Sequence, residues 1–362
     1  MSRAEQNKCY GGVKNLEYIK EININEAILH ILDNNSDEPI LNEYILDLDE
    51  DVYRFLLRHI EKCLRDEELK YAVFNEERNI VKEISQEYLN GQGNIIEISK
   101  EIARQMFTLM KSNYNIPSCD LVVVSISTEY GPLLGVFKMD YIKNFTHSVD
   151  FIDEKVGIKI LPELTGLPSS SQKIQKCAFI KPVRDGQEFN LMVIDKQNKG
   201  KDKENSDYGS SYFINKYLGC RIINNERDMT KNFIKAAEDW TRTNLSENAD
   251  RAERVRSEIK NKIKSEESIN VSELSNNIFG EKEEEKESFS EYINSQGISE
   301  NVDIDHDWVD KKLKRVRLKI DNDIDLYINH GIYSDNSRFE IQRVGDGSIN
   351  IVIKHVRNYI EK

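Results

Sequence analysis

The sequence contains few of the residues that mark disulfide-bonded, zinc-binding or membrane-spanning proteins. Its 362 residues include only five cysteines and six prolines. The cysteines are odd in number, widely spaced and without a Cys-x-x-Cys pair, so they predict neither a disulfide framework nor a zinc knuckle. No run approaches the roughly 18 to 20 apolar residues that a membrane span requires, and the first residues lack the apolar core of a signal peptide. We expect a cytoplasmic protein with reduced thiols and no membrane partner.

The common enzyme motifs are also absent. The chain has no G-x-x-x-x-G-K-[ST] loop, no G-x-G-x-x-G, no H-E-x-x-H and no G-x-S-x-G. "DNDID" at 321–325 lacks the glycine and the terminal glutamate of a calcium loop, and "DIDHDW" around His306 has no distant partner. We interpret the first as a turn and the second as a polar entry into the next element. We therefore expect no cofactor, no resident metal and no catalytic residue.

Hydrophobic periodicity predicts an α+β protein of three parts behind a polar leader, residues 1–21. Residues 22–205 form a mixed N-terminal domain, which starts with strand signals in "IKEININEAILHILDN" and "ILNEYILDL" and contains two amphipathic helices. It ends in an antiparallel β meander, between about residues 119 and 195, and a basic loop. Residues 206–300 have helical spacing. Residues 301–362 alternate between apolar and polar side chains, which predicts a small C-terminal antiparallel β element.

Within this outline a few positions carry specific predictions. His59 lies on the apolar side of a predicted helix with no second His or Cys in register, so we interpret it as a packed core histidine. Asn270 with Glu273, and Ser288 with Glu291, have the spacing of capping boxes, and Gly297 stands where a helix terminator belongs. The charge run "GEKEEEKES" is typical of a solvated linker or helix face.

Acidic residues outnumber basic ones, but unevenly. The formal net charge is −13, and residues 1–150 carry 16 basic against 26 acidic side chains. Residues 155–203 reverse the balance, with ten basic against five acidic. A second basic island, "KKLKRVRLK" at 311–319, contains no acid. Because nucleic-acid binding depends on Lys and Arg replacing counterions on phosphates, the acidic total argues mildly against it, whereas the two islands permit it.

The two islands differ in form. Lys196, Lys199, Lys201 and Lys203 stand among Gln, Asn and Gly, which is typical of a phosphate-contacting loop and equally of a solvated one. In the second island, an extended strand would place Arg315, Arg317 and Lys319 on one face and Val316, Leu318 and Ile320 on the other. That pattern fits a ribbon laid on phosphates, and equally an edge strand kept soluble by charge.

Metal-dependent nuclease chemistry is a third, weaker hypothesis. Asp120 at a strand start and the pair Asp153 and Lys155 would supply the carboxylates and the lysine that hold Mg²⁺ and assist an attacking water. Acid-x-Lys triplets, however, arise by chance in a chain this rich in Asp, Glu and Lys.

The stretch "SDYGSSYFINKYLGCRIINNERDMTKNFIKAAEDW" resembles the region after the basic loop in bacterial nucleoid-associated proteins of the NdpA/YejK type. In that family a basic loop leads into an aromatic helix, represented here by Tyr212, Phe213, Tyr217, Leu218 and Gly219. The order of the flanking segments is similar from about residue 22 to 355, including the downstream "FSEYINSQGI" with Phe289, Tyr292 and Gly297. This chain departs from the family by its extended leader and a more Lys/Asn-rich loop.

The resemblance implies a protein of the bacterial nucleoid that binds double-stranded DNA and has no established catalytic activity. On charge alone, we predict that the four loop lysines make the primary phosphate contacts and that Arg315, Arg317 and Lys319 support them. An adaptor that binds a DNA-processing enzyme at the nucleoid, with little direct DNA contact, is the alternative, motivated by the acidic first part. We expect a homodimer, since two copies would add their weak charge patches.

Overall fold

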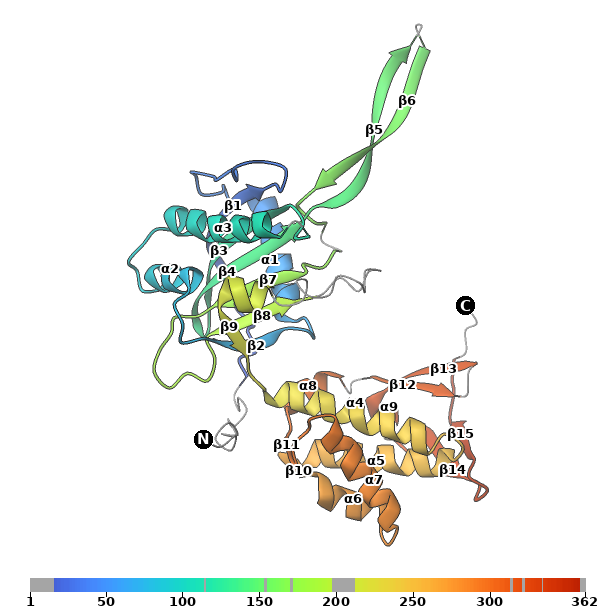
Figure 1. Ribbon diagram of the computed structural model, residues 1–362. Helices are drawn as coiled ribbons and strands as arrows, with labels where there is room; N and C mark the ends of the chain where they lie inside the picture. The colour runs from blue at the N-terminus through green and yellow to red at the C-terminus, as the bar shows by residue number, and fades with distance from the viewer. Residues whose placement is uncertain are drawn as a thin grey trace. The chain divides into compact units, whose positions relative to one another are not determined.

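The computed structural model describes residues 16–358, except residues 114, 153–154, 170–171, 197–211, 313–314, 321–322 and 334. The chain divides into two compact units, one spanning Glu17–Ile223 and the other running from Asn224 onward. They are called the sheet unit and the helical unit below (Figure 1). None of the helices within these described ranges is long and apolar enough to cross a membrane.

The sheet unit alternates strands and helices before a run of hairpins. Its elements are β1 (Ile22–Leu32), α1 (Glu50–Leu64), β2 (Lys70–Phe74), α2 (Ile80–Leu89), α3 (Ile95–Ser112), β3 (Cys119–Thr128), β4 (Gly131–Asp140), β5 (Ile142–Ile152), β6 (Lys155–Thr165), β7 (Lys176–Ile180), β8 (Leu191–Asp195), the short π-helix η1 (Tyr212–Leu218) and β9 (Cys220–Ile222).

Seven strands form one antiparallel sheet in the order β1-β3-β4-β7-β8-β2-β9. The predicted meander is confirmed, because β3, β4, β7 and β8 are consecutive neighbours. Between β4 and β7, however, β5 and β6 leave the sheet and pair only with each other, as a separate two-stranded ribbon (Figure 1). The strand predicted in "ILNEYILDL" is wrong. Its pairing with the backbone of β1 is an isolated bridge from Ile40 to Ile31 and a bond from the Leu46 amide to the Ala27 carbonyl.

The helices of the sheet unit begin at polar caps. Asp49, Asn79 and Asn94 accept hydrogen bonds from the amides three residues on, at the starts of α1, α2 and α3. Helices α2 and α3 cover one face of the sheet with an apolar core. On α1, His59 is buried, packs edge-on against Phe55 at 4.8 Å and lies with Nε2 3.2 Å from the Pro168 carbonyl oxygen. His59 is therefore a packed core histidine, as predicted.

The helical unit contains the remaining elements. They are α4 (Glu226–Asn244), α5 (Ala249–Ser265), β10 (Ser268–Asn270), α6 (Val271–Phe279), α7 (Glu283–Ser295), β11 (Asn301–Asp303), α8 (His306–Lys312), β12 (Arg315–Ile320), β13 (Ile324–Asn329), α9 (His330–Tyr333), β14 (Phe339–Arg343) and β15 (Ile349–Ile353).

An aromatic cluster holds this unit together. Trp240 packs edge-on against Phe279 and Phe289, each at 5.2 Å, and its indole N–H donates to Ser288 Oγ at 3.1 Å. Ser288 lies inside α7, five residues after its first residue, Glu283. The predicted helix start there is wrong, because the three acids Glu283–Glu285 already begin the helix, where its dipole favours negative charge. The Asn270 cap is confirmed by its bond from the Glu273 amide, and Gly297 follows α7 with φ +74°.

The C-terminal β element consists of two separate hairpins, β12–β13 and β14–β15. This confirms the predicted α+β class, with a large antiparallel sheet in the N-terminal half and small ones at the C-terminus. We placed domain boundaries at residues 205 and 300 from the sequence. Those boundaries stay a prediction. The structure divides by compactness after Ile223, with η1 and β9 packed into the sheet unit.

The sheet unit buries a histidine whose pKa is lowered. His30 of β1 is fully buried, with Nε2 2.9 Å from Ser99 Oγ of α3, and its Nδ1 accepts from the Asn42 amide at 3.1 Å. Burial, together with the charges of Lys100 and Arg104, lowers the pKa of His30 to about 4. The folded protein therefore holds this imidazole neutral at pH values where the unfolded chain protonates it.

We predict that His30 destabilises the fold as pH falls from about 6.5 to about 4, by roughly 2–3 kcal/mol at the lower end. Its folded pKa lies below the unfolded value, so the unfolded chain binds the extra proton in this window. Urea unfolding from pH 7 to pH 4 should show a shallower loss of stability in His30→Gln than in the unmodified protein. Equal slopes in the two proteins would show that His30 does not titrate in this way.

Candidate nucleic-acid interface

The predicted DNA-contacting loop starts at a lysine that is already paired. Lys196 directly follows β8, its amide donates to the Gln175 carbonyl at 2.9 Å, and its Nζ lies 2.5 Å from Asp66 Oδ2. Both side chains are about nine-tenths buried. Lys196 is thus an anchor between β8 and the segment after α1, and its charge is compensated within the sheet unit. Lys199, Lys201 and Lys203 lie outside the described residues.

Asp66 stays ionised in this setting. Burial acts to raise the pKa of Asp66, but the hydrogen bonds from Lys196 and the Glu68 amide, with the charges of Lys196 and Lys173, lower it below its usual value overall. Lys173 Nζ lies 3.9 Å away. One carboxylate therefore holds two of the basic side chains that the sequence places in the basic region 155–203.

A second set of ion pairs lies beside Tyr212, the first described residue after the basic loop. Lys176 of β7 pairs with Asp195 of β8, and Lys138 of β4 pairs with Asp140. Lys138 and Lys176 are register partners on neighbouring strands, and both side chains are buried. Their side chains lie on the same face of the sheet as the apolar core, at the end where β7 begins and β8 ends. Such pairs persist only when each charge is matched, since an unpaired buried ammonium or carboxylate is costly.

Tyr212 covers this row. Lys176 Nζ lies 5.0 Å from the centre of the Tyr212 ring, a cation–π distance. The ring is 7 % exposed, and its hydroxyl, like Asp195 Oδ2, has no hydrogen-bond partner among the residues that the structure describes. Burial raises the pKa of Tyr212, and the negative charges of Asp140 and Asp195 raise it further. The phenol is therefore neutral and covers the buried Lys176–Asp195 pair.

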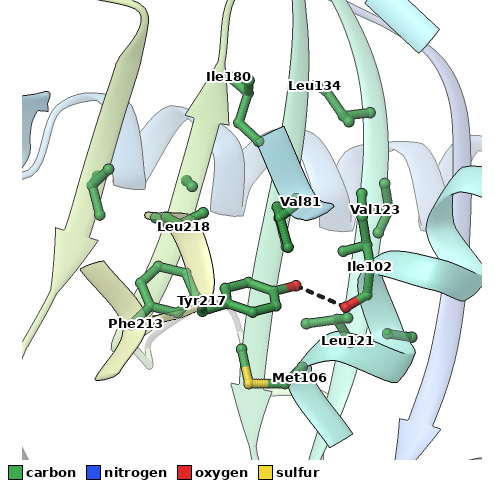
Figure 2. Packing of buried hydrophobic residues seen from close by; sticks show 14 of the residues in the cluster. Val81, Ile102, Met106, Leu121, Val123, Leu134, Ile180, Phe213, Tyr217 and Leu218 are labelled. Atoms are coloured by element: carbon green, nitrogen blue, oxygen red, sulfur yellow. Dashed lines mark hydrogen bonds between the residues drawn. The ribbon is translucent and has the colours of Figure 1, made fainter. Parts of the chain in front are cut away.

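The rest of η1 is inserted into the apolar core. Phe213, Tyr217 and Leu218 are fully buried, and the Tyr217 hydroxyl donates to the Ile102 carbonyl at 3.1 Å (Figure 2). Gly219 ends the segment with φ +57°, and a Cβ there would lie 2.8 Å from Asn79 Nδ2. The aromatic motif thus has a structural role. It ties the chain that leaves the loop to α2, α3 and the sheet.

The basic strip at 311–319 forms the first strand of a hairpin in the helical unit. β12 pairs with β13 so that Val316, Leu318 and Ile320 share one face with Ile328, Leu326 and Ile324. The predicted separation of basic and apolar faces is confirmed. On the polar face, Arg317 donates to Asp325 at 3.1 Å and lies over the Tyr327 ring at 5.3 Å, whereas Lys319 is exposed. Arg315 is the first residue of β12, and its side chain is outside the described part.

The structure does not bring the nuclease candidates together. Asp120 is buried at the root of the β5–β6 ribbon, where it accepts from the Tyr141 hydroxyl at 3.1 Å, and burial raises its pKa. Lys155 lies at the opposite end of the ribbon, as the first residue of β6, and Asp153 is outside the described residues. Ten residues of extended strand separate the two positions by roughly 30 Å. Within the described ranges, no three metal-binding side chains cluster.

Sequence reasoning missed the buried ion-pair row. The four charged residues of this row occupy inward positions at the same end of apolar strands: Lys138, Asp140, Lys176 and Asp195. Each strand therefore carries one or two charges at positions where the alternation predicts an apolar side chain. A charge at a position expected to be apolar is the sequence signal for a buried ion pair. Its partner cannot be read from one strand, because pairing depends on the order of strands in the sheet.

We predict that Asp66→Asn destabilises the sheet unit by about 2–4 kcal/mol, because it leaves Lys196 buried without its counter-charge. Urea unfolding measures the difference. Glu61→Gln, which removes the surface pair with Arg65 in α1, is the matched control and should change stability by less than about 0.5 kcal/mol. Adding Lys196→Gln to Asp66→Asn should restore part of the loss. An unaltered midpoint in the single variant would mean that Lys196 is not held by this carboxylate.

Comparison with known proteins bears on the whole chain. A search of curated proteins returned no match. A family model described as "Nucleoid-associated protein YejK" matches residues 28–361, which takes in both units, the basic loop, the aromatic η1 segment and the strip. The chain therefore belongs to the family of the nucleoid-associated protein YejK.

Proposed function

We propose that this protein binds duplex DNA in the bacterial nucleoid, mainly through phosphates and with little sequence specificity. Membership of a nucleoid-associated family supports the nucleoid role, and no motif in the chain reads base sequence recognisably. We also propose that it acts in the cytoplasm and without catalysis. The observation that carries the proposal is the basic loop between two fixed anchors, Lys196 on Asp66 and Tyr212 on Lys176.

Ion pairing near the loop supports giving the DNA contacts to the remaining loop lysines. Near the loop, Lys173, Lys176, Lys181 and Lys196 are each paired with a carboxylate. Lys176, Lys181 and Lys196 are buried and would have to give up that partner to reach a phosphate, whereas Lys173 is largely exposed and lies 3.9 Å from Asp66. Lys199, Lys201 and Lys203 follow in sequence, with a single acid, Asp202, between them. We propose these three as the primary phosphate ligands, with Lys196 setting where the loop begins.

Such a site would bind weakly and exchange rapidly. Three phosphate contacts give a slope of about −3 in log K against log salt, whereas repulsion between DNA and an acidic body opposes binding throughout. We propose that a homodimer compensates, because two linked copies of a weak site bind one duplex more tightly than either alone.

The adaptor is the second candidate function. It is favoured by the pairing of Lys176, Lys181 and Lys196 with acids and by the acidic excess of residues 1–150. Under that proposal, the protein reaches the nucleoid by binding a DNA-processing enzyme. Retention of duplex DNA by the purified protein at about 50 mM salt separates the two, because counterion release favours direct binding most at low salt. If no DNA is retained, pull-down of partners after nuclease treatment tests the adaptor.

We predict that Lys199→Glu, Lys201→Glu and Lys203→Glu together weaken duplex binding at least about tenfold and reduce the salt slope by about 3. Titrations by fluorescence anisotropy at several salt concentrations measure both. The matched control is Arg58→Glu, Arg184→Glu and Lys155→Glu, which reverses three exposed charges elsewhere in the sheet unit. If both triple variants lose affinity equally, net charge and not the loop governs binding.

The strip makes a separate prediction. Because Asp325 compensates Arg317, Asp325→Asn should free that guanidinium and raise duplex affinity by roughly two- to threefold. Reversing Arg315, Arg317 and Lys319 should lower affinity, but by less than the loop variant does. Anisotropy titration at low salt distinguishes these effects. A strip that takes no part in binding would leave affinity unchanged in both variants.

A further inference from the structure

The β5–β6 ribbon, called the arm below, carries an apolar face that is largely exposed in the part of the chain that the structure describes. Its strands are eleven residues each, antiparallel from Ile142 opposite Thr165 to Ile152 opposite Lys155. It extends from the sheet of its own unit as a two-stranded projection (Figure 1). Isolated two-stranded hairpins are marginal in water, and a ribbon of this length needs a third strand, a helix or a second layer to be stable.

The register sorts the side chains of the arm into two faces. One face is polar, with Asn144, Thr146, Ser148 and an ion pair between Asp150 and Lys159 at 2.7 Å. The opposite face is almost entirely hydrophobic. Its large side chains are all more than half exposed: Phe145, Val149, Phe151, Val156, Ile158, Ile160 and Leu164.

Exposed apolar surface of this extent is unusual on a protein that works alone. These seven side chains leave on the order of 800 Å² of apolar surface, more than the largest patch of a typical monomer. It also matches the area that one partner contributes to a stable interface of standard size. The area of the face is therefore sufficient for a dimer.

The charge of the arm argues against DNA as the occupant. Residues 142–165 carry three basic and four acidic side chains. The apolar face itself has one lysine, Lys143, and one histidine, His147, both in the half nearer the root. A phosphate backbone would gain little there, and burial of the large aliphatic residues would contribute nothing to its binding.

We propose that the apolar faces of two arms, one from each of two copies of this chain, pack together in an antiparallel, two-fold symmetric interface. An interface between identical faces must be self-complementary, and a hydrophobic face without acids meets that condition. With arms parallel, Lys143 would face its own copy. With arms antiparallel, it meets the uncharged tip half of the partner, which carries Phe151 and Val156. The product is a four-stranded sandwich of two layers.

The root of the arm is built to fix its direction. Tyr141, between β4 and β5, donates to Asp120 of β3. Gly166, which directly follows β6, packs so closely that a Cβ would lie 2.3 Å from Asp120 Oδ2 and 2.4 Å from the Tyr141 ring. Both strands of the ribbon are thus held against β3 where they leave the sheet. A fixed root reduces the orientational freedom lost when two arms dock.

The interface is independent of DNA and is tested without it. In sedimentation equilibrium, the full chain should be a dimer at micromolar concentration, and Phe151→Glu with Ile158→Glu should raise the dissociation constant at least about a hundredfold. The matched control, Thr146→Glu with Ser148→Glu, adds the same charge to the polar face and should leave the dimer intact. A monomeric unmodified protein at about 100 µM, or equal dissociation of both variants, overturns the proposal.

Cross-linking tests the geometry even if the charged variant folds poorly. In a Cys9→Ser background, the remaining four cysteines are buried. Mild oxidation should link Val149→Cys, near the middle of the arm, into a disulfide-bonded dimer, and should link a mixture of Phe145→Cys and Phe151→Cys chains to one another. Phe145→Cys alone should not cross-link. Cross-linking of Phe145→Cys alone, without the mixed product, would indicate parallel arms and contradict the antiparallel interface.

Discussion

The fold of the sheet unit depends on matching every buried lysine with a carboxylate. Lys138, Lys176 and Lys196 cannot be deprived of Asp140, Asp195 and Asp66 without leaving a charge in a medium that solvates it poorly. Lys138 and Asp140 lie on one strand, but Lys176 and Asp195 join neighbouring strands, and Lys196 and Asp66 are 130 positions apart. The last two pairs therefore help to fix the end of the sheet at which the chain leaves β8. The apolar core then continues from that end through Tyr217 and Leu218.

This pairing also changes how much of the formal charge of the chain remains uncompensated. Acidic side chains near the sheet are compensated by neighbouring bases, as Asp66 is by Lys196 and Lys173. The number of acids in the sequence therefore overstates the repulsion that an approaching phosphate meets there. The same holds for bases. Arg317 counts as positive in the strip, yet Asp325 compensates it. Net charge is therefore a poor guide to the surface of this chain.

Local periodicity predicted most elements correctly, because the spacing of apolar residues follows directly from helix or strand geometry. The two faces of β12 and the packed His59 are examples. The arm could not be predicted as a projection, since alternation in Val156, Ile158 and Ile160 is the same whether a strand lies in a sheet or stands apart. The Lys196–Asp66 pair was equally inaccessible, because the two residues are 130 positions apart. The order of many modest features, by contrast, was enough to indicate the family.

The position of β2 imposes an order of events on synthesis of the chain. β2 is complete at residue 74, but its two neighbours in the sheet, β8 and β9, begin only at residues 191 and 220. On the ribosome, β2 must wait unpaired while β3, β4 and the arm emerge and form their local hairpins. Closure of the sheet is thus a late, non-local step, which slows folding and leaves apolar strand edges open to misassociation until β9 arrives.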